Sequence, residues 1–526
     1  MTQARHLTAF ALSKLRRPGR QQPGQPGKDR RAVRHPAPAG RYRLTDTRRV
    51  IVVGGGIAGL AAATVLAERG AQVTLLESSD RLGGRVAAWP LDGGRTMSRG
   101  FHAFFRQYYN LRSLLRRTDP GLRRLIDIKD YPLQRPDGLR DSFAALPTTP
   151  PWSILGFVRQ SPTFTLKSLS GVDVRSALEL LRVRFPDTFS DYDGESAADF
   201  LDRLRFPQAA RDLALEVFAR SFFADPRDFS AGELVSMFHT YFLGSAEGLV
   251  FDVPDDDYDT VLWAPLAKLL GDLGAEVRTS SRVTGIALSP EGARVTLDGA
   301  ETLDADAVVL ASDPRSAREL IAGVALTGVA DDTAWRGRVA ATVNAPPFVV
   351  VRLWLDGLVE ARRPAFLATS GYGPLDNVSV LERFEAGAAE WSTRNGGSVV
   401  ELHAYACDAA IMHDQEAAEA VVAELEKQLR AVFPETVGLG VREREVLVRD
   451  DCTLIGPDRW EERPGVVTAW PQLVLAGDWV RCDYPVALME RAATTGFLAA
   501  NELLGRWGAA GQEIWTAPMR GLLALR

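Results

Sequence analysis

The segment 49–77 constrains the fold more than any other part of the chain; its sequence is RVIVVGGGIAGLAAATVLAERGAQVTLLE. The apolar, β-branched residues 50–53 predict a buried parallel strand, and glycines with the spacing G-x-G-x-x-G follow it directly. A helix over 57–69 that ends at Gly70 comes next, and a second strand over 73–76 follows the helix. Strand, glycine turn, helix and strand in this order predict a βαβ unit that binds a dinucleotide.

Each glycine of the turn has its own predicted role. Gly54 allows the tight turn, Gly56 lets a pyrophosphate approach backbone N–H groups at the helix N-terminus, and Gly59 lets the helix pack closely on the strand. Ile57 and Ala58 open the helix, so we expect their backbone to contact the cofactor as well.

The residues that follow the second strand favour a flavin over a nicotinamide. Glu77 ends that strand, where an acidic side chain would accept hydrogen bonds from ribose hydroxyls. The next segment, 80–85 with the sequence DRLGGR, resembles the R-x-G-G-R of the amine oxidase and carotenoid desaturase superfamily of FAD enzymes. The resemblance implies that Arg81 and Arg85 face ribose and pyrophosphate, and that the backbone at Gly84 lies against FAD.

A second segment near the other end of the chain supports FAD. Residues 473–504 indicate a strand, a glycine turn and a long helix, with Pro485 suited to the first helical turn and Gly505 suited to the stop. This segment resembles the C-terminal flavin motif of the same superfamily.

That second resemblance also implies cofactor contacts. Asp478, preceded by Gly477, is expected beside the ribityl chain or the phosphates. The backbone from Val486 to Met489 is expected to direct a helix dipole at the pyrimidine end of the flavin, where it would stabilise negative charge on the reduced ring.

A narrower resemblance lies in residues 94–115, whose sequence is GRTMSRGFHAFFRQYYNLRSLL. It is similar to the G-x-H-x-F-F-x-x-Y-x-N-L stretch of plant-type phytoene and ζ-carotene desaturases, and most of all to actinobacterial carotenoid φ-ring synthases (β-carotene desaturase/methyltransferases). The matching residues are Gly100, His102, Phe104, Phe105, Tyr108, Asn110 and Leu111. The resemblance implies an oxidoreductase of carotenoid biosynthesis that converts a β-ionone ring to an aromatic φ-ring, giving isorenieratene-type products.

The chemistry of such a reaction suggests catalytic candidates. Hydride loss to oxidised flavin beside the quaternary ring carbon would make a 1,2-methyl shift downhill, and proton loss would then complete the aromatic ring. Asp483 and Tyr484 match the D-Y that precedes the C-terminal helix of ζ-carotene desaturases, and His102 lies in the narrower motif. These three are the predicted catalytic residues, although none is assigned as the base.

The fold class predicted is α/β, with a Rossmann-like FAD-binding domain of the amine oxidase and glutathione reductase type and an inserted α+β substrate domain. The predicted boundaries are 1–48 for a disordered basic arm, 49–115, 264–315 and 466–505 for the FAD-binding domain, 116–263 and 316–465 for the substrate and membrane-facing domain, and 506–526 for a C-terminal tail.

Several elements complete this layout. In the FAD-binding domain we expect a helix over 266–273, one strand over 275–286, a hairpin turn at 290–292 and a strand over 307–311. By resemblance, the backbone of Val283 touches the adenine. In the substrate domain we expect a mainly helical part over 116–263. Strands 347–355, 398–406 and 441–448 with a helix over 415–432 are expected to form a sheet that roofs the flavin.

The charge distribution suggests where the protein lies. Residues 1–49 hold 13 Lys plus Arg and 2 Asp, whereas the whole chain carries a net charge of −5. Such an arm would be drawn to anionic lipid headgroups. No apolar run reaches the roughly 18 residues of a membrane span, so we expect a cytoplasmic protein attached peripherally to the inner face of the cell membrane. Residues 150–169 are an aromatic and aliphatic candidate for lipid contact.

Composition removes other classes of function. The 3 cysteines form neither a disulfide framework nor a metal cluster, and the 6 histidines show no metal-ligand spacing, so no metal is predicted. No nucleic-acid partner is expected; the expected partner is the carotenoid substrate, with a quinone or oxygen as the unidentified electron acceptor.

Other functions remain open at this point. An amine oxidase of this superfamily usually places a lysine near flavin N5, and this chain has no lysine between Lys268 and Lys427. A carotene desaturase or isomerase acting on an acyclic polyene shares every cofactor motif, and a flavin-bound carotenoid carrier would differ only in lacking turnover. The sequence also leaves open the ring product, whether one or both rings are converted, and the oligomeric state.

Overall fold

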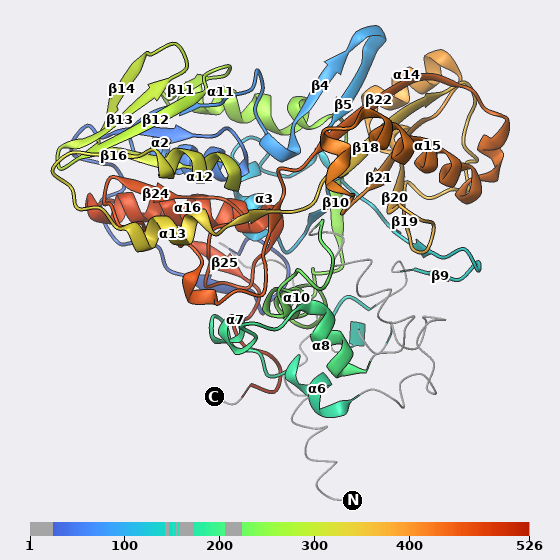
Figure 1. Ribbon diagram of the computed structural model, residues 1–526, viewed down its shortest axis with the longest axis horizontal. Helices are drawn as coiled ribbons and strands as arrows, with labels where there is room; N and C mark the ends of the chain where they lie inside the picture. Colours follow the sequence, from blue (N-terminus) through green and yellow to red (C-terminus); the bar gives the residue numbers. More distant parts are fainter. Residues whose placement is uncertain are drawn as a thin grey trace, which may run out of the picture.

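The computed structural model describes residues 25–142, 147–150, 152–153, 156, 173–205 and 223–524. Two sheets dominate it (Figure 1): a five-stranded parallel sheet with its helices on one side of the molecule, and a seven-stranded sheet with α15 (Gln415–Val432) on the other. Helices α6 (Val174–Glu179), α7 (Asp187–Asp191), α8 (Ala197–Leu204) and α10 (Ala231–Met237) form a lobe below both.

The five-stranded sheet has the strand order β11-β3-β2-β15-β24, and every neighbouring pair is parallel. Its strands are β2 (Arg49–Val53), β3 (Gln72–Leu76), β11 (Glu276–Arg278), β15 (Ala307–Leu310) and β24 (Leu473–Leu475). The α/β fold class is therefore confirmed, because three distant stretches of the chain meet in one parallel sheet.

Alternate residues of these strands bury against different layers. Val50 and Val52 face α2 (Ile57–Glu68) and α16 (Leu488–Arg506) in one core cluster. Ile51 and Val53 face the four-stranded sheet β14-β13-β12-β16 in another. That sheet consists of β12 (Val283–Ser289), β13 (Gly292–Leu297), β14 (Thr302–Ala305) and β16 (Ala325–Leu326). Burial on both faces explains the continuous apolar run of β2.

The βαβ unit forms where the sequence predicts it, and α2 ends before Gly70, whose φ is +87°. The helix predicted over 266–273 is present as α11 (Ala264–Asp272), and the predicted hairpin joins β12 to β13. The prediction of one strand over 275–286 is wrong. Ser280 has a φ of +50°, and the chain breaks there into β11 and β12, which belong to different sheets.

The start of the C-terminal helix also differs from the prediction. Pro485 precedes α16 rather than lying in its first turn, because the residues before Leu488 remain extended, with Ala487 at φ −141° and ψ 163°. The helix extends to Arg506 and so includes Gly505. The N-terminus of α16 therefore lies three residues later than the proline suggests.

The seven-stranded sheet has the order β22-β18-β21-β20-β19-β8-β9. Its strands are β8 (Leu133–Gln134), β9 (Arg140–Asp141), β18 (Phe348–Leu355), β19 (Phe366–Thr369), β20 (Asn377–Val380), β21 (Val399–Ala404) and β22 (Val441–Arg449). One face packs its valines and leucines against α15. On the opposite face, Arg352 of β18 donates to the Ser98 hydroxyl at 2.8 Å.

Smaller elements connect the two halves. A three-stranded sheet joins β6 (Phe104–Phe105), β10 (Phe251–Pro254) and β7 (Leu125–Asp127), and β4 (Ala88–Leu91) pairs with β5 (Arg95–Ser98). The remaining elements are α3 (Tyr109–Leu115), α12 (Pro314–Ala322), α13 (Thr333–Ala340), α14 (Ala386–Asn395), β17 (Val343–Asn344) and β23 (Thr453–Leu454). The described part of 116–263 contains the short strands β7, β8, β9 and β10 beside the helices α6, α7, α8 and α10.

The prediction of disorder is wrong for residues 25–48. Strand β1 (Val33–His35) pairs with β25 (Ile514–Thr516) from the C-terminal tail. The Glu247 carboxylate accepts hydrogen bonds from the backbone N–H groups of Lys28 and Asp29, at 3.0 and 3.1 Å. Partners distant in sequence thus order a segment that has little to bury by itself. Residues 1–24, and most of 150–169, lie outside the described residues.

One contact joins the two segments that resemble cofactor-binding motifs, 49–85 and 473–504. Helices α2 and α16 approach closely at Gly496, where a Cβ would overlap the carbonyl oxygen of Ala58 and lie 2.9 Å from the Cβ of Ala61. Only a residue without a side chain fits between the helices at this depth.

We expect Gly496→Ala to lower the free energy of unfolding by about 1–3 kcal/mol, because the added methyl group must push α2 and α16 apart. Thermal unfolding measures this as a lower Tm. The matched control is Gly271→Ala in α11, where a Cβ would meet no described atom within 4 Å; alanine there should leave the Tm equal or slightly higher. An unchanged Tm for Gly496→Ala would contradict the close approach.

Candidate functional site

The glycine turn after β2 leaves a surface on which a phosphate can rest. Gly54 has a φ of +111°, and a Cβ at Gly59 would overlap the carbonyl oxygen of Gly54. Gly56 differs, since among the described residues a Cβ there would have only the Cα of Gly84 nearby, at 3.9 Å. Gly56 thus leaves room for a ligand at the N-terminus of α2, whose first residues Ile57 and Ala58 are themselves buried.

The loop of the R-x-G-G-R motif lies directly beside this turn. Gly56 and Gly83 form a β-bridge, and the Gly83 N–H donates to the carbonyl of Gly55 at 2.9 Å. Gly83 and Gly84 both have positive φ, +102° and +55°. A cofactor held by the first motif would therefore also touch the second.

Glu77 points back at the same turn. One carboxylate oxygen accepts from the N–H of Gly55 at 2.7 Å, and the other accepts from the N–H and hydroxyl of Ser79, both at 2.8 Å. The residue is 9% exposed. These bonds fix the carboxylate at the carboxyl end of β3, where a ribose would lie.

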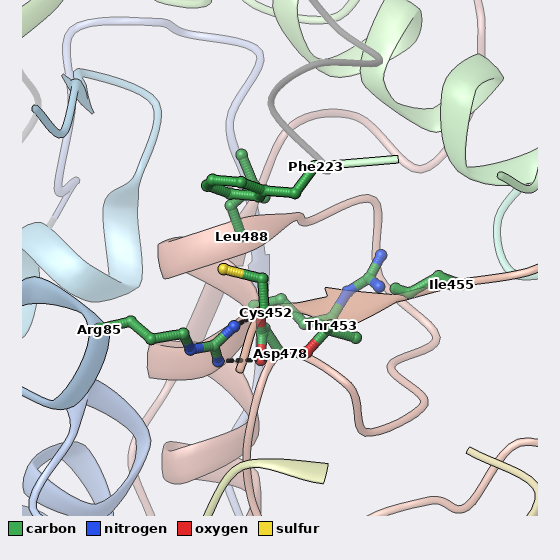
Figure 2. Close-up of a pocket in the computed structure, with 8 residues that line it drawn as sticks. Arg85, Phe223, Cys452, Thr453, Ile455, Asp478 and Leu488 are labelled. Carbon is green, nitrogen blue, oxygen red and sulfur yellow. Dashed lines mark hydrogen bonds and ion pairs between the residues drawn. The ribbon is translucent and has the colours of Figure 1, made fainter. Parts of the chain in front are cut away.

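An ion pair between Arg85 and Asp478 joins the two segments that resemble cofactor-binding motifs (Figure 2). The two guanidinium nitrogens donate to the two carboxylate oxygens at 2.8 and 2.5 Å, and the Thr453 hydroxyl donates to the same carboxylate at 3.1 Å. Burial alone raises the pKa of Asp478, but the Arg85 guanidinium outweighs it and the net pKa is lowered. The carboxylate is therefore charged, and so is Arg85.

This pair lies in a small cavity lined by Arg85, Phe223, Cys452, Thr453, Ile455, Asp478, Leu488 and Arg491. Figure 2 shows Phe223 and Leu488 on the side opposite the Arg85–Asp478 pair. Leu488, the first residue of α16, has a φ of +53°, a strained conformation for a side chain of this kind. The cavity thus has a charged side and an apolar side.

A buried ion pair supports the N-terminus of α16. The Arg491 guanidinium donates to Glu233 in α10 at 2.5 Å and to the carbonyl of Val486 at 2.9 Å. Arg463 contacts the same carboxylate at 3.1 Å. Arg491, Glu233 and Arg463 were not identified from the sequence, because single charged residues in amphipathic segments give no signal of burial.

The other predicted cofactor residues lie around these elements. Gly477 has a φ of +148° and accepts from the Thr495 hydroxyl, which ties the turn after β24 to α16. Val486 is buried before the helix, and Met489 is half-buried in its first turn. Val283 is half-buried at the first position of β12. Arg81 pairs with Asp80 at 2.7 Å and stacks over Trp89.

His102 is neutral. Burial lowers the pKa of its imidazole from 6.5 to about 4. Its Nδ1 lies 2.8 Å from the carbonyl of Gly100, so Nδ1 carries the proton and Nε2 holds the lone pair. The Tyr258 hydroxyl, which also donates to Gly100, accepts from the backbone N–H of His102 at 3.0 Å.

The other two predicted catalytic residues have different surroundings. Asp483 is exposed, and the half-buried Tyr484 packs its ring against His35 of the N-terminal segment, with centroids 4.4 Å apart. His102 instead packs against Tyr258. The three candidates therefore do not form one cluster.

The matching residues of the narrower motif are mostly structural. The Asn110 side chain donates to the Thr494 hydroxyl and the Trp515 carbonyl, and it accepts from the Trp515 N–H. The Tyr108 hydroxyl lies 2.6 Å from that of Tyr241. The bonds of Asn110 fasten α3 to α16 and β25.

Comparison with known proteins identifies the family. A model of the family described as flavin containing amine oxidoreductase matches residues 57–504. The chain belongs to this family. A second model, for pyridine nucleotide-disulphide oxidoreductases, matches residues 14–89, which include the βαβ unit. The cofactor is FAD. The open glycine turn, the fixed Glu77 carboxylate and the Arg85–Asp478 pair are groups that could hold it.

Individual relatives are more specific. The chain is 53% identical to a carotenoid phi-ring synthase of Streptomyces griseus over 95% of this chain and 96% of that protein. It is 28% identical to the carotenoid phi-ring synthase of Chlorobaculum tepidum over 92% of each chain. The solved structure of putrescine oxidase has a TM-score of 0.63 at 17% identity, covering 88% of this chain and all of that one, and so shows the same fold. The resemblance predicted from residues 94–115 is confirmed.

We expect Asp478→Asn to weaken FAD binding about tenfold or more, because the neutral amide leaves Arg85 without its buried counter-charge and has one fewer acceptor oxygen. The ratio of flavin to protein absorbance after purification and titration of the apoprotein with FAD measure this effect. Asp304→Asn, which breaks the surface ion pair with Arg294, is the matched control and should bind FAD normally. Equal FAD content in the two variants would show that Asp478 does not contact the cofactor.

Proposed function

We propose that this protein is an FAD-dependent carotenoid φ-ring synthase, which converts the β-ionone ring of β-carotene to an aromatic φ-ring by desaturation with a 1,2-methyl shift. The observation that carries the proposal is the 53% identity over 95% of the chain to the Streptomyces griseus protein of that name. The motif GFHAFFRQYYNL over 100–111 and the flavin segments lie within this likeness.

When bound, FAD supplies the oxidant that accepts hydride from the ring. The proposed cofactor contacts are Gly54, Gly56, Ile57, Ala58, Gly59, Glu77, Arg81, Gly84, Arg85, Val283, Gly477, Asp478, Val486 and Met489. Residues 49–115, 264–315 and 466–505 are the proposed FAD-binding domain. The α16 N-terminus would stabilise negative charge on the pyrimidine end of the flavin.

The chain's own contribution to the chemistry is to exclude water and to position the ring. Phe223 and Leu488 line the apolar side of the cavity, opposite the Arg85–Asp478 pair. An apolar wall keeps water from a cationic ring, so the methyl group migrates before the cation is trapped. Aromatic faces also stabilise positive charge that develops on the ring.

The reaction is tested by expressing the chain in a host that makes β-carotene and analysing the pigments by chromatography, absorption and mass. We expect products that are four hydrogens lighter for each converted ring with an unchanged carbon count, because both methyl groups stay on the ring. A host that makes ζ-carotene serves as the parallel assay. Unaltered β-carotene together with conversion of ζ-carotene would replace this proposal by an acyclic carotene desaturase.

We propose further that the protein binds the cytoplasmic face of the cell membrane peripherally, since its substrate dissolves in lipid. Within the described residues, no helix combines the length and apolarity of a membrane span. The first 24 residues contain five Lys or Arg and no Asp or Glu, which favours attraction to anionic headgroups.

Vesicle sedimentation tests this location. We expect the protein to sediment with vesicles that contain anionic lipid and to be released by about 0.5 M salt, because screening weakens surface electrostatics. Neutral phosphatidylcholine vesicles are the control. A variant that lacks residues 2–24 should sediment less, and equal sedimentation with both vesicle types would contradict an electrostatic contribution.

A further inference from the structure

Arg491 is a charged residue of the cavity wall that has no role in the chemistry described so far. It lies near the start of α16, it is 2% exposed, and it lines the cavity together with Arg85 and Asp478. Its Nε donates to the Val486 carbonyl at 2.9 Å, and its Nη2 donates to Glu233 at 2.5 Å. These two bonds fix the guanidinium group at the cavity wall.

The carboxylate of Glu233 is shared between two guanidinium groups. Arg463 donates to its other oxygen at 3.1 Å, and Glu233 is 0% exposed. Asp193 and Asp458 also attract Arg463, but among the described residues neither forms an ion pair with it. Because one carboxylate faces two guanidinium groups, Glu233 neutralises Arg491 only in part.

Arg491 remains charged in this buried position. Burial alone lowers the pKa of its guanidinium, but Glu233 outweighs burial and the net pKa is raised. Asp478 is also close enough to interact with it. Arg491 contributes to the lowered pKa of the Asp478 carboxyl, and Asp478 contributes to the raised pKa of Arg491. The cation therefore lies near the carboxylate that is expected beside the ribityl chain or the phosphates.

A cation at this position costs stability unless an anion lies beside it. The N-terminus of a helix carries partial positive charge, so the helix dipole of α16 repels an arginine near its start. A buried charge also loses its hydration, and an apolar side chain of similar size would avoid that cost. Departures of this kind from local rules concentrate at functional sites. An anionic group in the cavity would offset the cost that Glu233 offsets only in part.

Reduced FAD is an anion of the required kind. Reduction adds two electrons to the flavin ring. By resemblance, the pyrimidine end, where the negative charge is stabilised, faces the N-terminus of α16. A fixed cation at this N-terminus binds reduced FAD more tightly than the uncharged oxidised ring. By linkage, this difference in affinity raises the reduction potential of the bound cofactor.

We propose that Arg491, held in place by Glu233, is a further cofactor-binding residue that stabilises the negative charge of reduced FAD and so makes the bound cofactor a stronger oxidant. The role in carotenoid chemistry rests on the proposed function, but the charge of Arg491 acts on FAD whether or not a carotenoid is present. It adds a side-chain charge to the helix dipole expected at the same end of the flavin.

The ring chemistry gives a reason for a stronger oxidant. Loss of four hydrogens from each ring requires two oxidations. In each of them a C–H bond gives a hydride to FAD, the ring releases one proton, and a quinone or oxygen then takes up two electrons and two protons to restore oxidised FAD. A hydrocarbon ring has no heteroatom lone pair to stabilise the positive charge that hydride loss creates. Stabilisation of the negative charge by Arg491 favours both hydride transfers.

The test is Arg491→Met in the full-length protein with FAD bound and no carotenoid present. Methionine removes the charge, while Arg463 still pairs with Glu233. The reduction potential is measured by anaerobic equilibration with a reference dye. We expect the ratio of the affinities for reduced and oxidised FAD to fall about tenfold or more, which corresponds to a potential that is lower by about 30 mV for a two-electron couple.

Further variants separate the charge of Arg491 from its packing. Arg491→Lys keeps the charge, so the affinity ratio should stay within about threefold of the wild type. Glu233→Gln keeps Arg491 and removes its counter-charge, so the potential should rise, which a disturbed fold would not produce. The matched control is Arg506→Met at the other end of α16. It removes a guanidinium paired with Glu502 at 2.8 Å and should leave the potential unchanged.

The outcomes are distinct. An unchanged potential in Arg491→Met would overturn the role of Arg491. An equal fall in Arg491→Lys, or a fall in Glu233→Gln, would also overturn it, because both patterns indicate a general disturbance of the site. If Arg491→Met does not retain FAD, the potentials of Arg491→Lys and Glu233→Gln still decide the question. Unaltered β-carotene in the producing host, together with the expected potentials, would overturn only the proposed function.

Discussion

The close packing of α2 on α16 is the contact on which the rest of the site depends. It brings together two segments from opposite ends of the chain, and Gly496 permits it by leaving room for the carbonyl of Ala58. The Arg85–Asp478 pair then closes over the same junction. Two charges buried beside a cavity are stable only as a well-bonded pair.

The substrate half solves a related problem in a different way. One face of the seven-stranded sheet packs on α15 with apolar residues. The opposite face is also buried, but it holds the polar residues Arg352, Glu401 and His403. Each of them makes hydrogen bonds within the sheet or to the segment around Gly100, and these bonds offset the free-energy cost of burying polar groups. Such a network fixes the orientation of these groups without exposing them to water.

The sequence predictions are correct where local patterns determine the structure and wrong where contacts between distant residues determine it. Periodicity and turn residues predict the βαβ unit, the hairpin of β12 and β13, and helix α15, and all three form where predicted. The single strand over 275–286 and the disordered arm over 25–48 are wrong for one reason. Ser280 at positive φ and the pairing of β1 with β25 depend on partners that are far away in sequence.

The sequence by itself determined the cofactor class and the family. The glycine spacing, the arginines and the Glu77 carboxylate at the end of β3 encode contacts that are local along the chain. Only the tertiary structure decided which polar residues surround the cavity. It separated Tyr484 from His102, ordered the segment around His35, and brought Glu401, His403 and Tyr405 into hydrogen-bond contact. Hydrogen bonds between side chains on different strands depend on register and on layer packing, which no single segment specifies.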